Sequence, residues 1–575
     1  MRFERFLTRG RGVALAGILA LTSSLASAAD PQEVIAVMAL DPYADLRSQL
    51  TWVGEQVGNP TLAGFAESFI LLATQGKGLA GLDVKRPIGL VVTTAGGPLP
   101  SVHAFVPVKD LGKLLGATQG ILGPAEEADG VQRISPPGMP PLDVVERNGW
   151  AVLSQPGTPA AVDDPLAVIG PLAKDYSVAI EFFPSRMPAA MRDQLKNMVE
   201  QAGRNAAAQG QPIDEAGFRQ GLENFDQLEK LLFGLAIDAE HEDVHLDITT
   251  VLEPGAAAES FEAAGKAVST IASPATADGK QAAIRGHYAV VVPAEGRGAV
   301  RAAIDQGLEQ ADDDPVTRVV ANLLRELVAA MLDTGALDMG FTVDTAAADT
   351  SSPLPAVTIG MQVKDGAALQ QRVKERLGKP DALPPQVKVA FDVGTEGAAT
   401  LHEITVDVSG TPAAERLGDG VKATLAVTPD HAFVLVGGDV RARIAAAVAQ
   451  GRTAVADAAP LAGIDVSLAA LVSYAARMMQ AFSPEDPQGE ALADVAKQAA
   501  EKDSTRVQFS LKPVPRGATF RLLIDEGALQ TVAASTSMQA VQTRPGPAPR
   551  AVPAVPLRPA QPRPIEKENA PAIAP

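Results

Sequence analysis

Hydrophobic and polar residues alternate in four pairs of neighbouring stretches, and each pair is followed by a stretch of helical periodicity. A period of two is typical of β-strands with one buried face, and a period near 3.6 is typical of amphipathic helices. The sequence therefore predicts four antiparallel hairpins, each followed by a helix. The expected strand pairs are Ile88–Thr94 with Val102–Val108, Leu235–Ala239 with Val244–Leu252, Met339–Val343 with Val357–Val363, and Val507–Leu511 with Thr519–Ile524.

A short acidic or glycine-containing break separates each predicted hairpin from its helix, as expected for a capped helix start. The breaks are Lys109-Asp110, Glu253-Pro254-Gly255, Lys364-Asp365-Gly366 and Asp525-Glu526-Gly527. One more strand and one or two long helical stretches precede each hairpin. The strands are expected at Val34–Leu40, Val178–Phe183, Tyr288–Pro293 and Ile464–Leu468, and the helical stretches at about Tyr43–Ala80, Ala189–Leu232, Gly298–Leu332 and Ala470–Lys502.

The order of these units indicates an internal tandem duplication. The first and third units carry an extra strand and helix, beginning at Asn148–Leu153 and Asp430–Leu435, which the second and fourth units lack. Two halves are therefore predicted, at 33–283 and 284–540. Their four α+β units are expected at 29–173, 174–283, 284–458 and 459–540. Because neighbouring strands join mostly through hairpins, the fold class is expected to be α+β with antiparallel sheets.

Residues 1–28 have the pattern of a cleavable secretory signal peptide. Four arginines precede the apolar stretch Val13–Leu25, which is too short for a comfortable membrane span. Ala26 and Ala28 fit a signal-peptidase site, so the mature chain is expected to begin at Ala29, with an uncleaved anchor as the alternative. No later stretch contains 18 consecutive apolar residues. The sequence predicts an exported, soluble protein, either periplasmic or cell-surface and extracellular.

The composition excludes several kinds of site. The 575 residues contain no cysteine, which removes disulfides, thiolate zinc ligands and a cysteine nucleophile. Aromatic residues make up only 4% of the chain, so carbohydrate binding by aromatic stacking is disfavoured. The formal net charge of -19 argues against nucleic acid as a partner, because phosphate binding requires a basic patch. This charge instead helps to keep an exported protein soluble.

The C-terminal segment 541–575 differs from the rest of the chain. It contains ten prolines, five basic residues and two acidic residues, which give a local charge of +3. Without this segment and the signal peptide, which also carries +3, the remaining residues carry -25. Such a composition forms no packed core and predicts a disordered, extended tail. One hypothesis is contact between the tail and an anionic envelope surface or a partner protein, and the other is a passive extension.

The segment His241-Glu242-Asp243-Val244-His245 matches the H-E-x-x-H motif of zinc proteases. That motif works on a helix, where both histidines lie on one face. Here the motif falls on a predicted hairpin turn. Aligning the apolar faces of the two strands pairs Ala239 with Leu246, which places the two histidines on opposite faces of the sheet. A solvated turn is therefore expected, without a zinc site.

Other motifs also lack the context that their chemistry requires. The segment Gly76-Lys77-Gly78-Leu79-Ala80-Gly81 satisfies G-x-G-x-x-G, but it follows a predicted helix and precedes a strand, so a glycine-rich helix stop is predicted. The run Asp312-Asp313-Asp314 lacks the ligand spacing of a calcium loop. The hairpin register also brings Asp238 opposite Asp247, which is unfavourable unless a cation lies near. No catalytic, cofactor-binding or metal-binding residue is assigned.

The run Gly81-Leu82-Asp83-Val84-Lys85-Arg86-Pro87-Ile88-Gly89, with the hairpin after it, resembles exported bacterial proteins of the domain-of-unknown-function kind. The resemblance covers the first unit and implies no chemistry. The leading functional hypothesis is a non-enzymatic scaffold or binding protein of the cell envelope. The alternatives are a hydrolase whose carboxylates only the fold brings together, and a carrier of an apolar ligand.

Overall fold

The computed structural model describes residues 34–542, with gaps at 95–99, 129, 159–161, 163, 209–224, 268, 270–281, 310–314, 347–352, 380–382, 412–413, 451–460, 484 and 503. The predicted signal peptide, the tail from residue 543 onward and the run Asp312–Asp314 lie outside the described residues. Within the described ranges, no helix is both long enough and apolar enough to cross a membrane.

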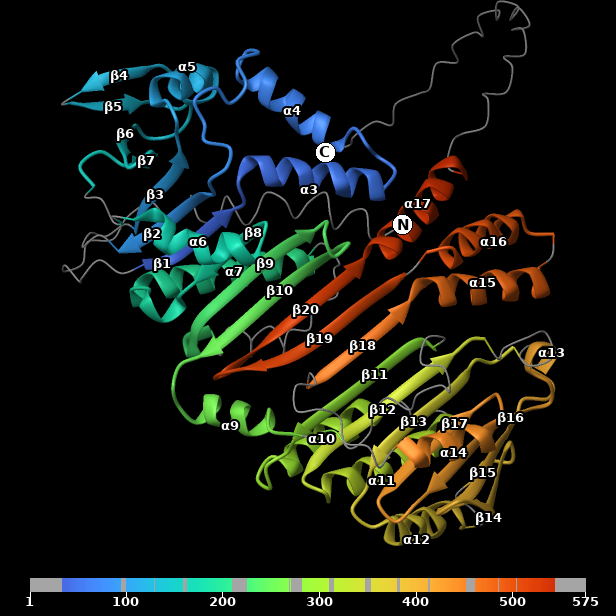
Figure 1. Ribbon diagram of the computed structural model, residues 1–575. Helices are drawn as coiled ribbons and strands as arrows, with labels where there is room; N and C mark the ends of the chain where they lie inside the picture. The colour runs from blue at the N-terminus through green and yellow to red at the C-terminus, as the bar shows by residue number, and fades with distance from the viewer. Residues whose placement is uncertain are drawn as a thin grey trace, which may run out of the picture.

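The strands of the described residues form one antiparallel sheet of 20 strands (Figure 1). The strands of the first half are β1 (Val34–Leu40), β2 (Ile88–Thr94), β3 (Pro100–Pro107), β4 (Ala125–Ala128), β5 (Val131–Ile134), β6 (Leu142–Arg147), β7 (Trp150–Ser154), β8 (Val178–Phe182), β9 (Leu228–Asp238) and β10 (Asp243–Leu252). Those of the second half are β11 (Ala282–Val291), β12 (Ala336–Asp344), β13 (Ala356–Gln362), β14 (Val387–Glu396), β15 (Ala399–Asp407), β16 (Gly420–Val427), β17 (His431–Val436), β18 (Ala462–Ser467), β19 (Arg506–Val514) and β20 (Gly517–Asp525).

The strand order is the same when it is read from either edge of the sheet. From one edge the strands pair in the order 4-5-6-7-3-2-1-8-9-10, and from the other edge in the order 14-15-16-17-13-12-11-18-19-20. The two series meet where β10 pairs with β20, with Asp247 opposite Arg521. The predicted class of mixed α+β with an antiparallel sheet is therefore confirmed.

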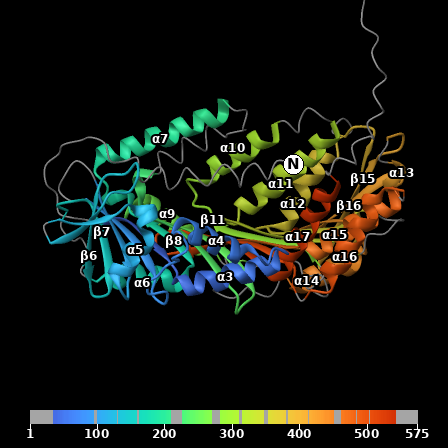
Figure 2. The same ribbon diagram turned by 90° about the horizontal axis from the view of Figure 1, so that it is seen from above.

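Helices cover both faces of this sheet. Those named below are α3 (Tyr43–Gln56), α4 (Leu62–Ala73), α5 (Leu111–Leu122), α6 (Pro165–Asp175), α7 (Ala189–Ala208), α9 (Ala256–Ala264), α10 (Arg297–Leu308), α11 (Pro315–Leu332), α12 (Gly366–Leu377), α14 (Val440–Gln450), α15 (Leu468–Phe482), α16 (Pro487–Ala500) and α17 (Glu526–Gln542). Figure 2 shows α7, α10 and α11 on one side of the sheet, and α6, α14, α15 and α16 on the other.

The cores lie under these helices rather than at the centre of the sheet. In the first half, α6 places Ile169 over Phe105 and Trp150. In the second half, α11 and α12 cover the opposite face, where Leu327 and Leu369 are almost fully buried. Burial of such side chains stabilises the fold by about 1.5–3 kcal/mol each.

Several predicted elements are confirmed by the structure. Strands β1 and β2 begin and end at the predicted residues. Two of the predicted helix starts have the expected side-chain cap, because Asp110 and Asp365 each accept a hydrogen bond of 3.0 Å from the backbone N–H three residues later.

Other boundaries were wrong. The residues from Leu228 to Leu232 belong to β9 and not to the helix predicted up to Leu232, since α7 ends at Ala208. Strand β11 begins at Ala282 rather than at Tyr288. Strands β4 to β6 and β14 to β16 were not predicted. β4 and β5 have only four residues each, whereas the alternation of Val387, Val389 and Phe391 in β14 was a strand signal that was overlooked.

Candidate functional site

The six strands at the centre of the sheet, in the order β9, β10, β20, β19, β18 and β11, have one apolar face. Since alternate residues of a strand point to opposite faces, the register assigns each side chain to a face. Five large side chains on the apolar face are between 36% and 42% exposed, and we call this group the central apolar face. Its members are Phe233, Tyr288, Ile464, Phe509 and Phe520.

The register arranges this face in rows that cross all six strands. One row consists of Phe233, Ile248, Phe520, Leu511, Ala462 and Tyr288, each opposite the next. The neighbouring row consists of Leu235, Leu246, Leu522, Phe509, Ile464 and Gly286. Neither row contains a charged or amide side chain. Apolar side chains in such rows normally pack under a helix or a second sheet.

The helices of the described residues leave part of this face open, since its five large side chains stay 36–42% exposed although α9 contacts β20 and β11. On this side of the sheet, α7 packs through Met191 and Leu195 next to Phe182 of β8, and α11 packs on β12 and β13 through Leu327 and Met331. Figure 2 shows α7, α10 and α11 in a row along this side of the sheet. Helix α10, the middle one, has no buried residue and therefore does not pack closely on the strands.

A second exposed apolar surface lies on α4. Phe65, Phe69 and Leu72 occupy one side of this helix at positions i, i+4 and i+7, and they are 73%, 67% and 80% exposed. Leu71 beside them is 47% exposed. We call these four residues the α4 ridge. The helix packs on α3 and α5, and Figure 1 places it beyond the ends of the strands.

The opposite face of the central strands is polar and carries an ion pair between a buried carboxylate and a partly exposed arginine. Asp247 of β10 has a side chain only 2% exposed and accepts hydrogen bonds of 2.7 and 2.6 Å from the Arg521 guanidinium of β20. The Tyr176 hydroxyl donates a third bond of 3.0 Å. Burial alone would raise the pKa of Asp247, but the bonds and charge of Arg521 lower it below its usual value. Burial and, as a smaller cause, the negative charge of Asp247 raise the pKa of Tyr176 to about 12.

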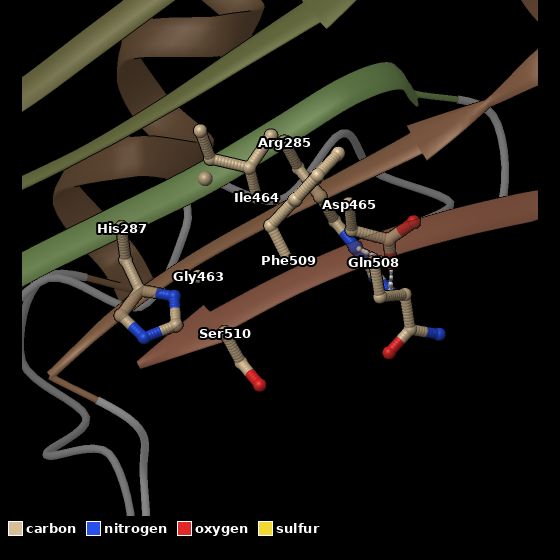
Figure 3. Close-up of a pocket in the computed structure, with 9 residues that line it drawn as sticks. Arg285, His287, Gly463, Ile464, Asp465, Gln508, Phe509 and Ser510 are labelled. Carbon is tan, nitrogen blue, oxygen red and sulfur yellow. Dashed lines mark hydrogen bonds and ion pairs between the residues drawn. The ribbon is translucent and has the colours of Figure 1, made fainter. Parts of the chain in front are cut away.

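A second acidic residue on the polar face is held in the same way. Asp465 of β18 accepts bonds of 2.8 and 2.5 Å from Arg285, and one of 2.7 Å from Arg506. Arg285 and Asp465 border a cavity of about 280 Å³ that His287 and Ser510 also line (Figure 3). Both central carboxylates are therefore engaged by arginines, which leaves neither of them placed as a general acid or base.

Glycine forms the floor of this cavity. A Cβ at position 463 would lie 2.8 Å from the ring of His287, so a side chain here would displace the imidazole. Figure 3 shows His287 beside Gly463, on the strand next to it.

The H-E-x-x-H segment lies at the turn between β9 and β10, as predicted. His241 is an exposed turn residue whose Nδ1 lies 2.6 Å from Asp238, and this contact raises the pKa of His241. His245 lies on the polar face, with Nδ1 3.3 Å from Asp243 and its ring in a T-shaped contact with the ring of Tyr176. The segment is not helical, which is the context that the zinc motif requires.

The predicted register of this hairpin was wrong. Leu246 lies opposite Leu235 rather than Ala239, and Asp247 lies opposite Gly234 rather than Asp238. The Asp238 carboxylate accepts bonds of 3.0 Å from the backbone N–H groups of the next two turn residues. This Asx turn ends β9 at Asp238 and makes the loop four residues long, which shifts the register by four positions.

The G-x-G-x-x-G segment follows α4 and precedes β2, as predicted. Gly76, Gly78 and Gly81 all have positive φ, at 84°, 63° and 91°. A Cβ at Gly81 would lie 2.3 Å from the backbone oxygen of Asp110. The glycines are therefore required by a left-handed turn and a close backbone approach, and they do not open a helix.

No protein-family model, curated protein or solved structure matches the chain. Among the described residues, no three or more His, Asp or Glu side chains are grouped so that they could hold a metal ion. The two apolar surfaces were missed by sequence reasoning. The alternation of Phe509 and Phe520 showed that their strands have an apolar face, and only the placement of the helices leaves that face uncovered.

Proposed function

We propose that the chain is an exported, non-enzymatic binding protein or scaffold, and that its central apolar face binds an apolar helix of a protein partner. The observation that carries this proposal is the exposure of Phe233, Tyr288, Ile464, Phe509 and Phe520 on one face of the sheet. Contiguous apolar patches of more than a few hundred Å² on soluble proteins are typical of interaction sites.

A helix is the element that suits this surface best. The six strands from β9 to β11 span about 24 Å at the usual strand spacing, and α7 and α11 pack on the neighbouring strands of the same face. A flat partner would meet these helices first, whereas an α-helix is about 10–12 Å across with its side chains. Packing of a helix on a sheet is also how the rest of this sheet is covered.

We further propose that the chain arose by tandem duplication, with residues 33–283 and 284–540 as the two halves. The support is the strand order, in which each pairing among β1 to β10 has a counterpart ten strands later. Two related halves that meet at β10 and β20 place the central apolar face at their junction. A binding surface would then exist only in the duplicated chain.

Export to the periplasm or the cell surface is part of the same proposal. It is supported by the predicted signal peptide at 1–28 and by the absence of cysteine, which leaves no thiol to oxidise outside the cytoplasm. A hydrolase gains no support at the centre, because Asp247 and Asp465 are both paired with arginines.

The test is the binding of Nile red, a neutral apolar dye, to the purified full chain at low protein concentration. The double variant Phe509→Ser, Phe520→Ser is expected to bind at least fivefold less dye. The matched control is Phe65→Ser, Phe69→Ser on α4, where two even more exposed phenylalanines are removed. Equal dye binding by the wild type and the Phe509, Phe520 variant would show that the central apolar face is not a binding surface.

A further inference from the structure

We propose that the helix bound by the central apolar face is α4 of a second copy of this chain, so that copies associate head to tail. This inference rests on the proposed function of the central apolar face and names its partner. Within the described ranges, the central apolar face and the apolar side of α4 both keep large side chains exposed. Both surfaces are apolar, so burying one against the other removes exposed phenylalanines of each from water.

The two surfaces cannot meet within one chain. Helix α4 packs on α3 and α5 beyond the strand ends (Figure 1). The central apolar face lies on the side of the sheet that carries α7 and α11. Contact between the ridge and the face therefore requires two molecules, and each molecule keeps one free surface of each kind.

The dimensions of α4 suit the space on the sheet. Its 12 residues make a helix about 18 Å long, which fits within the six central strands. Phe65, Phe69 and Leu72 follow each other at one-turn spacing, as is typical of helices that dock in apolar grooves. Gly64, beside the ridge, has no atom within 4 Å of an added Cβ, so this side of the helix is open to a close approach.

Charge also permits this contact. Without its signal peptide the chain carries a net charge of -22, so copies repel each other at long range. The α4 ridge and the central apolar face contain no charged residue, and Glu67, the acidic residue of α4, is paired with Arg47. Association at these two surfaces therefore brings no like charges into direct contact. It should become stronger with added salt, because salt screens the repulsion between the negative charges elsewhere on the two copies.

The edges of the sheet favour this mode of association over strand addition. Edge strand β4 carries Glu126 and Glu127, both exposed. Edge strand β14 is interrupted by an irregularity around Asp392, which has a φ of 54°. Charged and bulged edges are the usual protection against pairing with another sheet.

Mixing two variants tests the proposal. The ridge variant is Phe65→Ser, Phe69→Ser, and the face variant is Phe509→Ser, Phe520→Ser. In analytical ultracentrifugation, the average molecular mass of the wild type is expected to increase with protein concentration up to about 100 μM. This high concentration is needed because a contact of this size gives weak affinity. Each variant alone is expected to stay monomeric, and an equimolar mixture is expected to stop at a 1:1 dimer, because one intact ridge and one intact face remain.

Other outcomes would overturn the proposal. A face variant that still associates by itself would show that ridges pair with ridges. A wild type that stays monomeric, or a mixture that does so, would show that α4 does not dock on the face. Nile red binding is measured at low protein concentration and does not depend on self-association. The central apolar face can therefore be a binding surface even if α4 does not dock on it. If the face variant lacks a cooperative thermal transition, Ile464→Asn, at a position 42% exposed, takes its place.

Discussion

The two faces of the central six strands come from alternate residues of the same strands, and they differ in what their side chains contact. On the polar face, Asp247 and Asp465 are each paired with arginines from neighbouring strands. On the apolar face, Phe509 and Phe520 keep more than a third of their surface in contact with water. The polar face is thus internally satisfied, whereas the apolar face gains free energy only when something covers it.

This difference separates structural residues from residues available for binding. A buried ion pair stabilises the fold weakly but is costly to break, because the remaining charge is left unpaired. A half-exposed phenylalanine contributes less to folding and retains surface to bury on binding. Substitutions on the polar face should therefore affect stability, and those on the apolar face should affect association.

The largest effect is expected for Arg521→Met. This change leaves the carboxylate of Asp247, with a side chain 2% exposed, without its cation. The free energy of unfolding at pH 7, measured by urea denaturation, is expected to fall by about 3–5 kcal/mol. Lys512→Met, an exposed change on the same face, is the control and should stay within about 0.5 kcal/mol of the wild type. A loss below about 1 kcal/mol for the arginine variant would contradict the assignment.

The same variant has a definite pH dependence. Arg521 holds the pKa of Asp247 below its usual value, so the stability that this carboxylate contributes is present above its ordinary pKa and is lost as pH falls through the lowered one. In the variant, burial of Asp247 without its cation favours the protonated acid. The gap in unfolding free energy between wild type and variant should therefore narrow between pH 7 and about pH 4.

A smaller effect is expected where the polar face approaches Tyr176. A Cβ at Gly234 would lie 2.4 Å from the Tyr176 ring, and the hydroxyl of that ring is bonded to Asp247. Gly234→Ala should therefore lower the unfolding free energy by about 1–3 kcal/mol. Gly64→Ala in α4, with open space around the added methyl, should instead stabilise by roughly 0.5–1 kcal/mol. If Gly234→Ala and Gly64→Ala change the melting temperature equally, the ring of Tyr176 moves away from the added methyl group without cost.

The apolar face should tolerate substitution better than the polar face. Phe520 is 36% exposed, so Phe520→Ser removes only part of the burial that a core phenylalanine provides. A loss of about 1 kcal/mol is expected in urea unfolding, with Phe520→Leu within about 0.5 kcal/mol of wild type. If Phe520→Ser instead costs as much as Arg521→Met, the apolar face is a core surface and the contrast between the two faces is lost.

The smallest effect is expected at the turn where both faces end. The carboxylate of Asp238 raises the pKa of His241, so the imidazolium contributes stability that is present below its ordinary pKa and disappears as pH rises through the raised one. His241→Ala should remove a slight decline of melting temperature between about pH 6 and pH 8.

Elemental analysis of the wild type should find no stoichiometric zinc. One zinc per chain that is lost in this variant would restore the metal-site hypothesis.

Local sequence determined the elements of this protein but not how they are covered. The apolar run Val34–Leu40 and the stretch Ile88–Thr94 predicted the bounds of β1 and β2, and the acidic breaks at Asp110 and Asp365 located two helix starts. These signals act within a few residues. The turn at Asp238 is also local, but its Asx bonds were not anticipated, and the register of β9 and β10 was predicted wrongly as a result.

Long-range contacts decided the rest. The sequence indicated that Phe509 and Phe520 share a strand face with other apolar residues, but a period of two reports only which side chains point the same way. Whether a helix lies over them depends on pairings such as β10 with β20, which join residues about 270 positions apart. The partners of Asp247 depend on the same pairing, since Arg521 reaches it only across that junction. The uncovered face and the ion pair behind it are therefore properties of the tertiary structure, because neither exists until the two halves of the sheet are joined.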